Sequence, residues 1–235
     1  MNKPMELTGK RALVTGGALR IGKAITLALQ AAGAEVVVHY RHSEAEARSL
    51  SPFSVQADLE SMEDCTRLMK EAGSLDILIN NASIFTKDTL APATPERVRQ
   101  EFNVNLFAPM ELTRLFAAQA REGAIVNLLD RRIRANDPTC LPYSISKKGL
   151  EELTKLAALE LAPGIRVNAV APGPILPPPG NSGENFRELA GTIPLDLLPT
   201  PDHIAEAVLF LLQADYCTGQ VIFVDGGQHL LGNGV

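Results

Sequence analysis

The stretch Thr15-Gly16-Gly17-Ala18-Leu19-Arg20-Ile21-Gly22 decides the fold of this chain. It follows a short run with strand character, residues 11–15, and precedes a segment of helical period that begins at Ile21. Glycines in such a turn let backbone N–H groups approach a phosphate, which the partial positive charge of the helix N-terminus attracts. The turn therefore predicts a strand-to-helix unit that binds a dinucleotide through Gly16, Arg20, Ile21 and Gly22.

The same alternation of strand and helix continues to the end of the chain. Strand-like runs lie at residues 11–15, 35–40, 53–57, 76–80, 124–129, 166–171 and 220–225, and helical periods near 62–72, 95–119, 142–161 and 201–213. Continuous apolar runs, VVV at 36–38 and ILI at 77–79, are typical of strands that are covered on both faces. We predict a Rossmann-type α/β fold, a doubly wound parallel sheet of about seven strands with helices on both faces.

Composition narrows the function classes. The 235 residues contain no internal repeat or linker, which favours one domain over residues 1–235. A net charge of −5 disfavours a nucleic-acid partner, and the three scattered cysteines suggest neither a disulfide framework nor a metal site. No apolar run is long enough to span a membrane and no signal core opens the sequence, so a cytoplasmic protein is expected.

A proline-rich segment interrupts this pattern near residues 172–191. Pro172, Pro174 and the prolines at 177–179 deny a sheet its N–H donors, and Gly180, Asn181, Ser182 and Gly183 follow. We expect a surface loop after a strand's carboxyl end, where open α/β sheets bind ligands. Its role is either a substrate lid or a plain connector.

The end of the second strand bears on the choice of cofactor. An acid at this place suits the ribose hydroxyls of NAD, whereas a basic residue suits the 2′-phosphate of NADP. Here the residues are His39, Tyr40, Arg41, His42 and Ser43. We predict NADP(H), with Arg41 and Ser43 on the phosphate; the alternative for Arg41 is an ordinary surface arginine. Two further segments complete the predicted pocket: Asp58 and Leu59 after the third strand, and Asn81, Ala82 and Ser83 after the fourth.

The candidate catalytic pair is Tyr143 and Lys147, which open a predicted helix. Their four-residue spacing puts the phenol and the ammonium on one helix face. A free tyrosine has a pKa of about 10, and a nearby cation lowers it. We therefore expect Lys147 to make Tyr143 a stronger acid.

These motifs, in this order, resemble the short-chain dehydrogenase/reductase family over essentially the whole chain. TGxxxxxG, NNA, an internal Asn, YxxxK, the Pro172-Gly173 turn and VDGG at 224–227 all match. The resemblance implies that Tyr143 donates the proton, that Lys147 binds the nicotinamide ribose, and that Asn105, rather than Asn103, holds a relay water. It also places Pro172 and Gly173 at the cofactor and implies a homo-oligomer, specifically a tetramer.

One departure from the family pattern points to the substrate. Asp130 stands thirteen positions before Tyr143, where the family usually has Ser. Together with Arg20 and Phe85, this resembles the pteridine reductases and the bacterial dihydromonapterin reductases, as does HYRHSEAEA at 39–47, although Arg41 and His42 stand in the reverse of that group's order. The resemblance implies that Phe85 stacks on a pterin and that Asp130 assists proton delivery; the substrate contacts would be Arg20, Ser83, Phe85, Asp130 and Tyr143. The alternative for Phe85 is core packing.

The leading hypothesis is NADPH-dependent reduction of a dihydropterin or dihydrofolate to the tetrahydro form. A carbonyl reductase acting on a 3-oxoacyl thioester or another ketone is the second hypothesis, and a non-catalytic nucleotide-sensing protein is the third. The arginines Arg131, Arg132 and Arg134 directly follow Asp130. We expect them to form a solvated loop; the alternatives are that they attract an anionic substrate or that they lower the pKa of Asp130.

Overall fold

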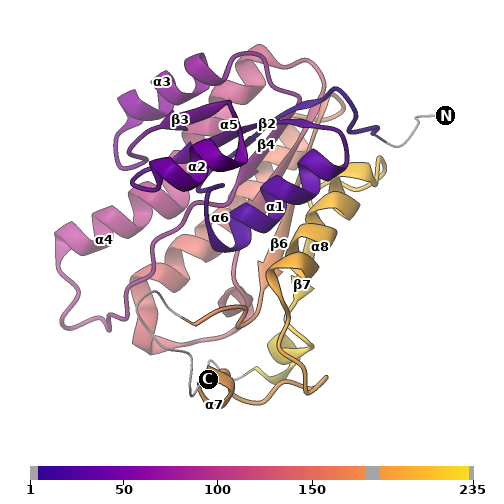
Figure 1. The fold of residues 1–235 in the computed structure, drawn as a ribbon. Coiled ribbons are helices and arrows are strands. Elements are labelled where there is room, and N and C mark those ends of the chain that lie inside the picture. Colours follow the sequence, from indigo (N-terminus) through magenta and orange to yellow (C-terminus); the bar gives the residue numbers. More distant parts are fainter. Residues whose placement is uncertain (1–4, 178–185, 233–235) are drawn as a thin grey trace.

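The computed structural model describes residues 5–177 and 186–232, and its centre is a parallel sheet of seven strands (Figure 1). The order of the strands across the sheet is β3-β2-β1-β4-β5-β6-β7. The strands are β1 (Arg11–Val14), β2 (Glu35–Tyr40), β3 (Ser54–Gln56), β4 (Ile77–Asn80), β5 (Gly123–Leu128), β6 (Ile165–Pro172) and β7 (Val221–Val224). The α-helices are α1 (Arg20–Ala31), α2 (Glu44–Leu50), α3 (Met62–Ala72), α4 (Pro95–Phe102), α5 (Ala108–Gln119), α6 (Leu141–Glu160), α7 (Phe186–Leu189) and α8 (Pro201–Gln213).

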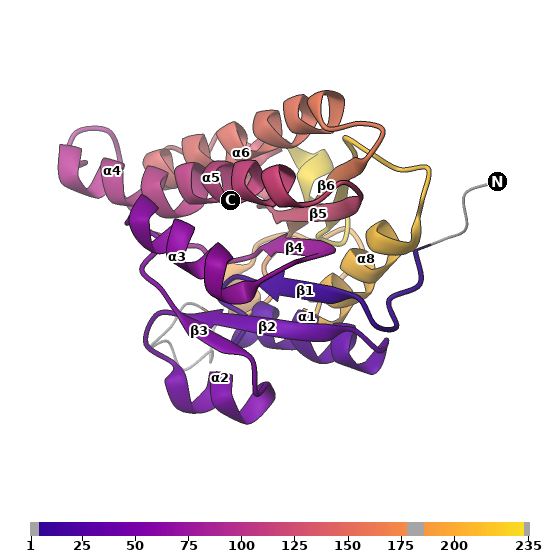
Figure 2. The ribbon, with the colours of Figure 1, turned by 90° about the horizontal axis from the view of Figure 1, so that it is seen from above.

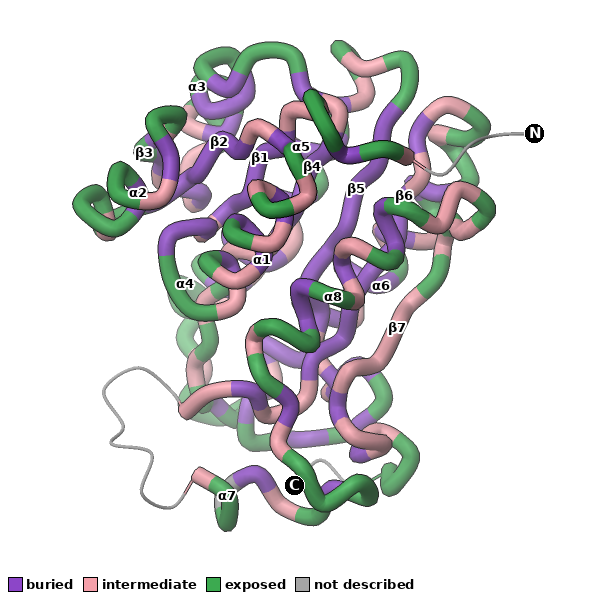
Figure 3. Tube along the Cα trace, turned by 45° about the vertical axis from the view of Figure 1, so that its right-hand side comes forward, coloured by how far each residue is buried: buried purple, intermediate pink, exposed green. Residues whose placement is uncertain are grey.

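Helices cover both faces of the sheet, as the sequence predicts (Figure 2). Because successive side chains of a strand point to opposite faces, β1 contributes to two cores. Ala12 and Val14 pack with Ile25 of α1 in one core, whereas Leu13 packs with Phe116 of α5 in the other. Burial is accordingly concentrated along the strands, and exposed residues lie on the outer helix faces and loops (Figure 3).

Three predicted segments differ in the structure. The single helix expected at 95–119 is divided by a π-helical turn, Asn103–Phe107, between α4 and α5. Helix α2 has no predicted counterpart, because it is short, charged and buries only Ala47. The loop expected near 172–191 is also shorter than predicted, since β6 continues through Pro172 and α7 lies inside the segment. The prolines at 178 and 179 and the following Gly180, Asn181, Ser182 and Gly183 lie outside the described residues.

The topology fixes where a ligand binds. Strand β1 pairs with β2 on one side and with β4 on the other. The chain therefore crosses from one side of β1 to the other between β3 and β4. Crevices at the carboxyl ends of strands at such a switch point are the usual ligand sites of open α/β sheets. The glycine turn that follows β1 lies at this edge. Within the two described stretches of chain, no helix is long and apolar enough to cross a bilayer.

Candidate active site

The turn between β1 and α1 has a backbone that requires glycine. Gly16 has a φ of 60°, in the left-handed region. At Gly22, a Cβ would lie 2.1 Å from the carbonyl oxygen of Gly16 and 2.6 Å from Nδ2 of Asn81. Arg20 has a φ of 54°, which is unusual for a residue with a side chain. The turn is thus closely packed against the segment that follows β4.

His39 holds this turn in place. Its Nδ1 accepts a hydrogen bond from the backbone N–H of Gly16 (3.0 Å), and its Nε2 donates to the carbonyl of Ala57 (3.1 Å). Burial lowers the pKa of His39 to about 4, so the ring is neutral at physiological pH. His39 therefore positions the glycine turn in addition to lining the cavity beside it. The neighbouring Tyr40 is also predicted to bind the cofactor. Its side chain packs in the hydrophobic core instead, because Tyr40 lies on the same face of β2 as Val36 and Val38.

The N-terminus of α1 is left without a protein cap. Leu19 precedes the helix and provides no side-chain hydrogen bond, and the first turn contains no acidic residue. By contrast, Ser61 caps α3 and Thr94 caps α4 through their side chains. Unsatisfied N–H groups and the helix dipole together make such a terminus an anion site. The beginning of α1 therefore suits a pyrophosphate.

A cavity of about 360 Å³ opens beside this terminus, and its volume is within the range of small-molecule sites. Eleven residues predicted for the cofactor or substrate line it: Gly16, Arg20, Ile21, Gly22, His39, Arg41, Asp58, Leu59, Asn81, Ala82 and Ser83. Four more were not predicted, namely Leu19, Ala57, Ile84 and Val104. All four are neighbours of predicted residues in the chain, and their apolar side chains carry no chemical signal. Other predicted residues do not line this cavity: Tyr40, His42, Ser43, Phe85, Asn105, Asp130, Tyr143, Lys147, Pro172 and Gly173.

Arg41 lies at the cavity in contact with two acids. Its guanidinium is 2.8 Å from the carboxylate of Asp58 and 3.0 Å from that of Glu60. All three side chains are partly exposed, so this network is screened by solvent and exchanges partners at low cost. Arg41 is therefore available to a phosphate that enters the cavity.

Two other predicted contacts have protein partners of their own. Arg20 donates to the carbonyl of Pro177 (2.8 Å), so it joins the glycine turn to the segment after β6. Gly173 donates its N–H to the carbonyl of Val224 (3.0 Å), and a Cβ at Gly173 would lie 2.7 Å from Cβ of Asp225. Both residues thereby fix the backbone that follows β6.

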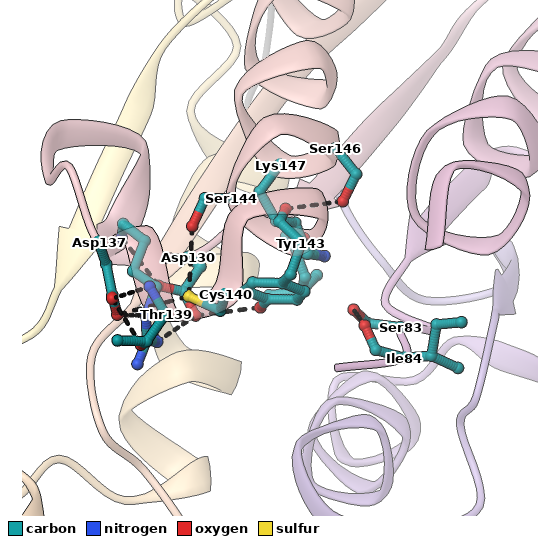
Figure 4. Close-up of polar contacts among 12 residues, drawn as sticks. Ser83, Ile84, Asp130, Asp137, Thr139, Cys140, Tyr143, Ser144, Ser146 and Lys147 are labelled. Atoms are coloured by element: carbon teal, nitrogen blue, oxygen red, sulfur yellow. Dashed lines mark hydrogen bonds and ion pairs between the residues drawn. The ribbon is translucent and has the colours of Figure 1, made fainter. Parts of the chain in front are cut away.

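Tyr143 and Asp130 are joined by a hydrogen bond. The Tyr143 hydroxyl donates to Oδ2 of Asp130 at 3.0 Å (Figure 4). Burial and the negative charge of Asp130 raise the pKa of Tyr143 well above its usual value. The phenol consequently stays protonated at neutral pH, which is the state of a proton donor.

Lys147 lies beside the ring of Tyr143 and bonds to the backbone at the end of β5. Its Nζ donates to the carbonyl of Leu128 (2.7 Å) and lies 5.8 Å from the centre of the Tyr143 ring. Burial lowers the pKa of Lys147 to about 8. In the protein alone, the pKa of Tyr143 is raised by burial and by Asp130. A lowering of this pKa by Lys147 stays a prediction.

Asn105 lies in the π-helical turn and is fully buried, whereas Asn103 is only partly buried. The Oδ1 atom of Asn105 accepts hydrogen bonds from the Ser83 hydroxyl (3.0 Å) and the Ile84 N–H (2.9 Å). Its Nδ2 donates to the Ile84 carbonyl and to Glu101, both at 2.9 Å. π-turns are frequent at functional sites, and this one directs Asn105 at the segment after β4.

Glu101 is a site residue that the sequence analysis missed. It is 1% exposed, and its carboxylate accepts the N–H of Thr86 at 2.7 Å in addition to the amide of Asn105. Burial raises the pKa of Glu101. Glu101 and Asn105 together fix residues 83–86 against α4 and the π-turn. No local pattern could have identified Glu101, because it looks like one more charged residue on a polar helix.

Phe85 projects from this fixed segment onto Tyr143. The two rings meet edge to face, with centroids 4.8 Å apart, and the Arg132 guanidinium lies 5.5 Å from the centre of the Phe85 ring. Phe85 is 42% exposed, so it is not a core residue. Its neighbours Ser83 and Ile84 lie across the site from Tyr143, with Ser83 on the side nearer the tyrosine (Figure 4). An exposed aromatic face thus lies beside the predicted proton donor.

The arginines after Asp130 are not the solvated loop that we expected. They form a short 3-10 turn, Arg131–Arg134, in which Arg131 is buried. Arg132 pairs with Asp130 (3.3 Å) and Asp137 (3.2 Å), and Arg134 pairs with Glu151 (2.6 Å). Asp130 and Asp137 are close to the run in sequence, whereas Glu151 lies on α6, and the run itself gives no sign of which acid each arginine pairs with.

Known proteins are similar to this chain in sequence and in fold. A family model described as enoyl-(acyl carrier protein) reductase matches residues 17–229. The chain is 36% identical to a 3-oxoacyl-(acyl-carrier-protein) reductase of Staphylococcus aureus, covering 96% of this chain and 100% of that protein. It is 34% identical to the L-xylulose reductase of Mus musculus, covering 94% and 97%. It is also similar to the crystal structure of FolM alternative dihydrofolate reductase 1 from Brucella canis complexed with NADP, with a TM-score of 0.90, 33% identity, and 96% of each chain covered.

Proposed function

Because the chain belongs to the short-chain dehydrogenase/reductase family, we propose that it is an NADPH-dependent reductase that converts a dihydropterin or dihydrofolate to the tetrahydro form. The uncapped N-terminus of α1 would hold the pyrophosphate, and Arg41 would hold the 2′-phosphate of NADP(H). When bound, the cofactor supplies the hydride.

One observation carries the substrate proposal: Asp130 accepts the Tyr143 hydroxyl while the exposed ring of Phe85 lies against the same tyrosine. A flat heterocycle would stack on Phe85 and present a ring nitrogen to Tyr143. Tyr143, kept protonated by burial, would give its proton to that nitrogen. Asp130 would orient the hydroxyl, and Ser83 and Arg20 would contact the substrate from the other side of the site.

A second candidate function is reduction of a ketone, because the 3-oxoacyl and L-xylulose reductases are as similar in sequence as the dihydrofolate reductase. Tyr143 would then protonate the carbonyl oxygen as hydride reaches the carbon. In this case, the acid at position 130 and the aromatic ring at position 85 would have no specific use.

The experiment that separates the two candidates is an NADPH absorbance assay with dihydrobiopterin, dihydromonapterin, dihydrofolate and a panel of ketones, repeated with NADH. We expect turnover of a dihydropterin and a preference for NADPH. Asp130→Ser and Phe85→Ala should each lower kcat/KM for the pterin. Turnover of ketones alone, surviving in Asp130→Ser, would reject the pterin proposal and support the second candidate.

We further propose that residues 1–235 form one cofactor-binding domain and that the protein assembles into a homo-oligomer, a tetramer by its family resemblance. Exposed large apolar side chains on the outer faces of the π-turn, α5 and α6 favour assembly: Phe107, Met110, Ile145, Leu156 and Leu159. Sedimentation analysis would test the oligomeric state, and a concentration-independent monomer would reject it.

A further inference from the structure

Resting on the proposed pterin chemistry, we infer that Arg132 is a positioning residue that fixes Asp130 as a hydrogen-bond acceptor and thereby confines the enzyme to dihydropterins, excluding fully oxidised pterins. The proposed function leaves open whether fully oxidised pterins are reduced as well, and this role of Arg132 decides that point at the same site.

Both oxygens of Asp130 face donors. Oδ1 accepts the backbone N–H of Arg132 (2.8 Å) and its Nη1 (3.4 Å). Oδ2 accepts the Tyr143 hydroxyl (3.0 Å) and the same Nη1 (3.3 Å). A protonated carboxyl would have to direct its own O–H against one of these donors, because only the ionised form accepts at both oxygens. In this arrangement Asp130 is an acceptor.

The guanidinium that imposes this geometry is itself fixed. Its Nε donates to Asp137 (3.2 Å), and Asp137 also accepts the N–H (2.9 Å) and the hydroxyl (2.6 Å) of Thr139. Against the effect of burial, these hydrogen bonds lower the pKa of Asp137 to about 2, so its charge persists. The ring of Phe85 lies 5.5 Å from the guanidinium carbon on another side. Arg132 therefore cannot turn away from Asp130 without losing Asp137 and Phe85.

The chemistry of pterins makes this arrangement selective. Reduction of a 7,8-dihydropterin adds hydride to C6 and one proton to N5, which converts the N5=C6 bond to a single bond. Reduction of a fully oxidised pterin to the 7,8-dihydro form adds hydride to C7 and one proton to N8 instead. N5 and N8 lie on opposite sides of the ring, so Tyr143 cannot face both nitrogens in one pose. The carboxyl bonded to Tyr143 is a potential second acid beside the site, and its pairing with Arg132 keeps it an acceptor.

The test compares the kcat of a fully oxidised pterin with that of its dihydro form, using the intact protein and NADPH. Binding of the oxidised pterin is measured separately by its own fluorescence. For the wild-type protein we expect tight binding of both forms but a kcat for the oxidised form at least about 100-fold lower, the scale of one lost general acid. Arg132→Gln should raise the ratio of the two kcat values at least about tenfold with little change in binding.

Arg134→Gln is the matched control, because it removes a neighbouring arginine that pairs with Glu151 and not with Asp130. It should leave the ratio unchanged. Comparable kcat values for the two forms in the wild-type protein, or an unchanged ratio in a folded Arg132→Gln protein that binds pterin, would overturn the inference while leaving the proposed function intact. No turnover of any pterin would overturn both. If Arg132→Gln does not fold, the ratio is measured in Asp137→Asn, which weakens the hold on the same guanidinium; an unchanged ratio there would overturn the inference.

Discussion

The burial of Lys147 should make the stability of the protein depend on pH in a way that one substitution removes. Lys147 is 2% exposed, and burial lowers its pKa from 10.5 to about 8. In the unfolded chain the side chain is solvated and keeps the ordinary value. Between these two pKa values the unfolded state therefore binds one proton more than the folded state, and the free energy of unfolding rises with pH.

The size of the effect follows from the shift. Each pH unit inside the window contributes about 1.4 kcal/mol, so the rise from pH 7 to pH 9.5 is about 2 kcal/mol, most of it above pH 8. Lys147→Met has no titrating group at this position. The difference in unfolding free energy, wild type minus variant, should therefore increase by about 2 kcal/mol over this range. Because other groups titrate in both proteins, only this difference isolates Lys147.

Urea unfolding followed by circular dichroism at pH 7 and pH 9.5, at one protein concentration, measures this difference. Lys148→Met is the control, because Lys148 is less buried and bonds to Asn136 at the protein surface. A difference between wild type and Lys147→Met that stays constant within about 0.5 kcal/mol across the range would refute the reasoning, since a solvated lysine would not be linked to folding in this window.

Four further predictions test the site. Tyr143→Phe should lower kcat by about 10²- to 10⁴-fold while the Kd for NADPH, measured by cofactor fluorescence, changes little, because only the proton donor is lost. Arg41→Ala should raise the Kd for NADPH about tenfold or more and leave that for NADH unchanged, with Arg48→Ala as the control; equal effects on both cofactors would contradict a phosphate contact. Glu101→Ala leaves the N–H of Thr86 without its acceptor and removes one acceptor from the buried amide of Asn105, so the free energy of unfolding should fall by about 1–3 kcal/mol and KM for the pterin should rise; an unchanged denaturation midpoint would argue against this role of Glu101. Gly22→Ala should abolish NADPH binding in titration calorimetry, since its Cβ would lie 2.1 Å from a carbonyl oxygen, and retained affinity would show that the turn can relax.

The sequence alone determined the layout of the fold. Apolar runs and helical periods are local properties, and they identified the strands and most helices within a few residues. The glycine turn after β1 could also be recognised, because positive φ and close packing both require glycine at fixed positions. The pair Tyr143 and Lys147 was identifiable for the same reason, since four-residue spacing on a helix puts two side chains on one face.

Only the tertiary structure decided how the site's polar groups are paired. Asn81 donates to the carbonyl of Thr15, 66 residues away in the chain, and Glu101, a residue that the sequence analysis did not single out, holds Thr86 from helix α4. The pKa of Tyr143 is raised by burial and by Asp130, and the spacing of Tyr143 and Lys147 on one helix reveals neither cause. The role of Arg132 depends on Asp137 and Phe85 converging on one guanidinium. Periodicity records which face of an element is apolar, but desolvation and hydrogen bonding depend on which elements meet, and that is set only when the chain has folded.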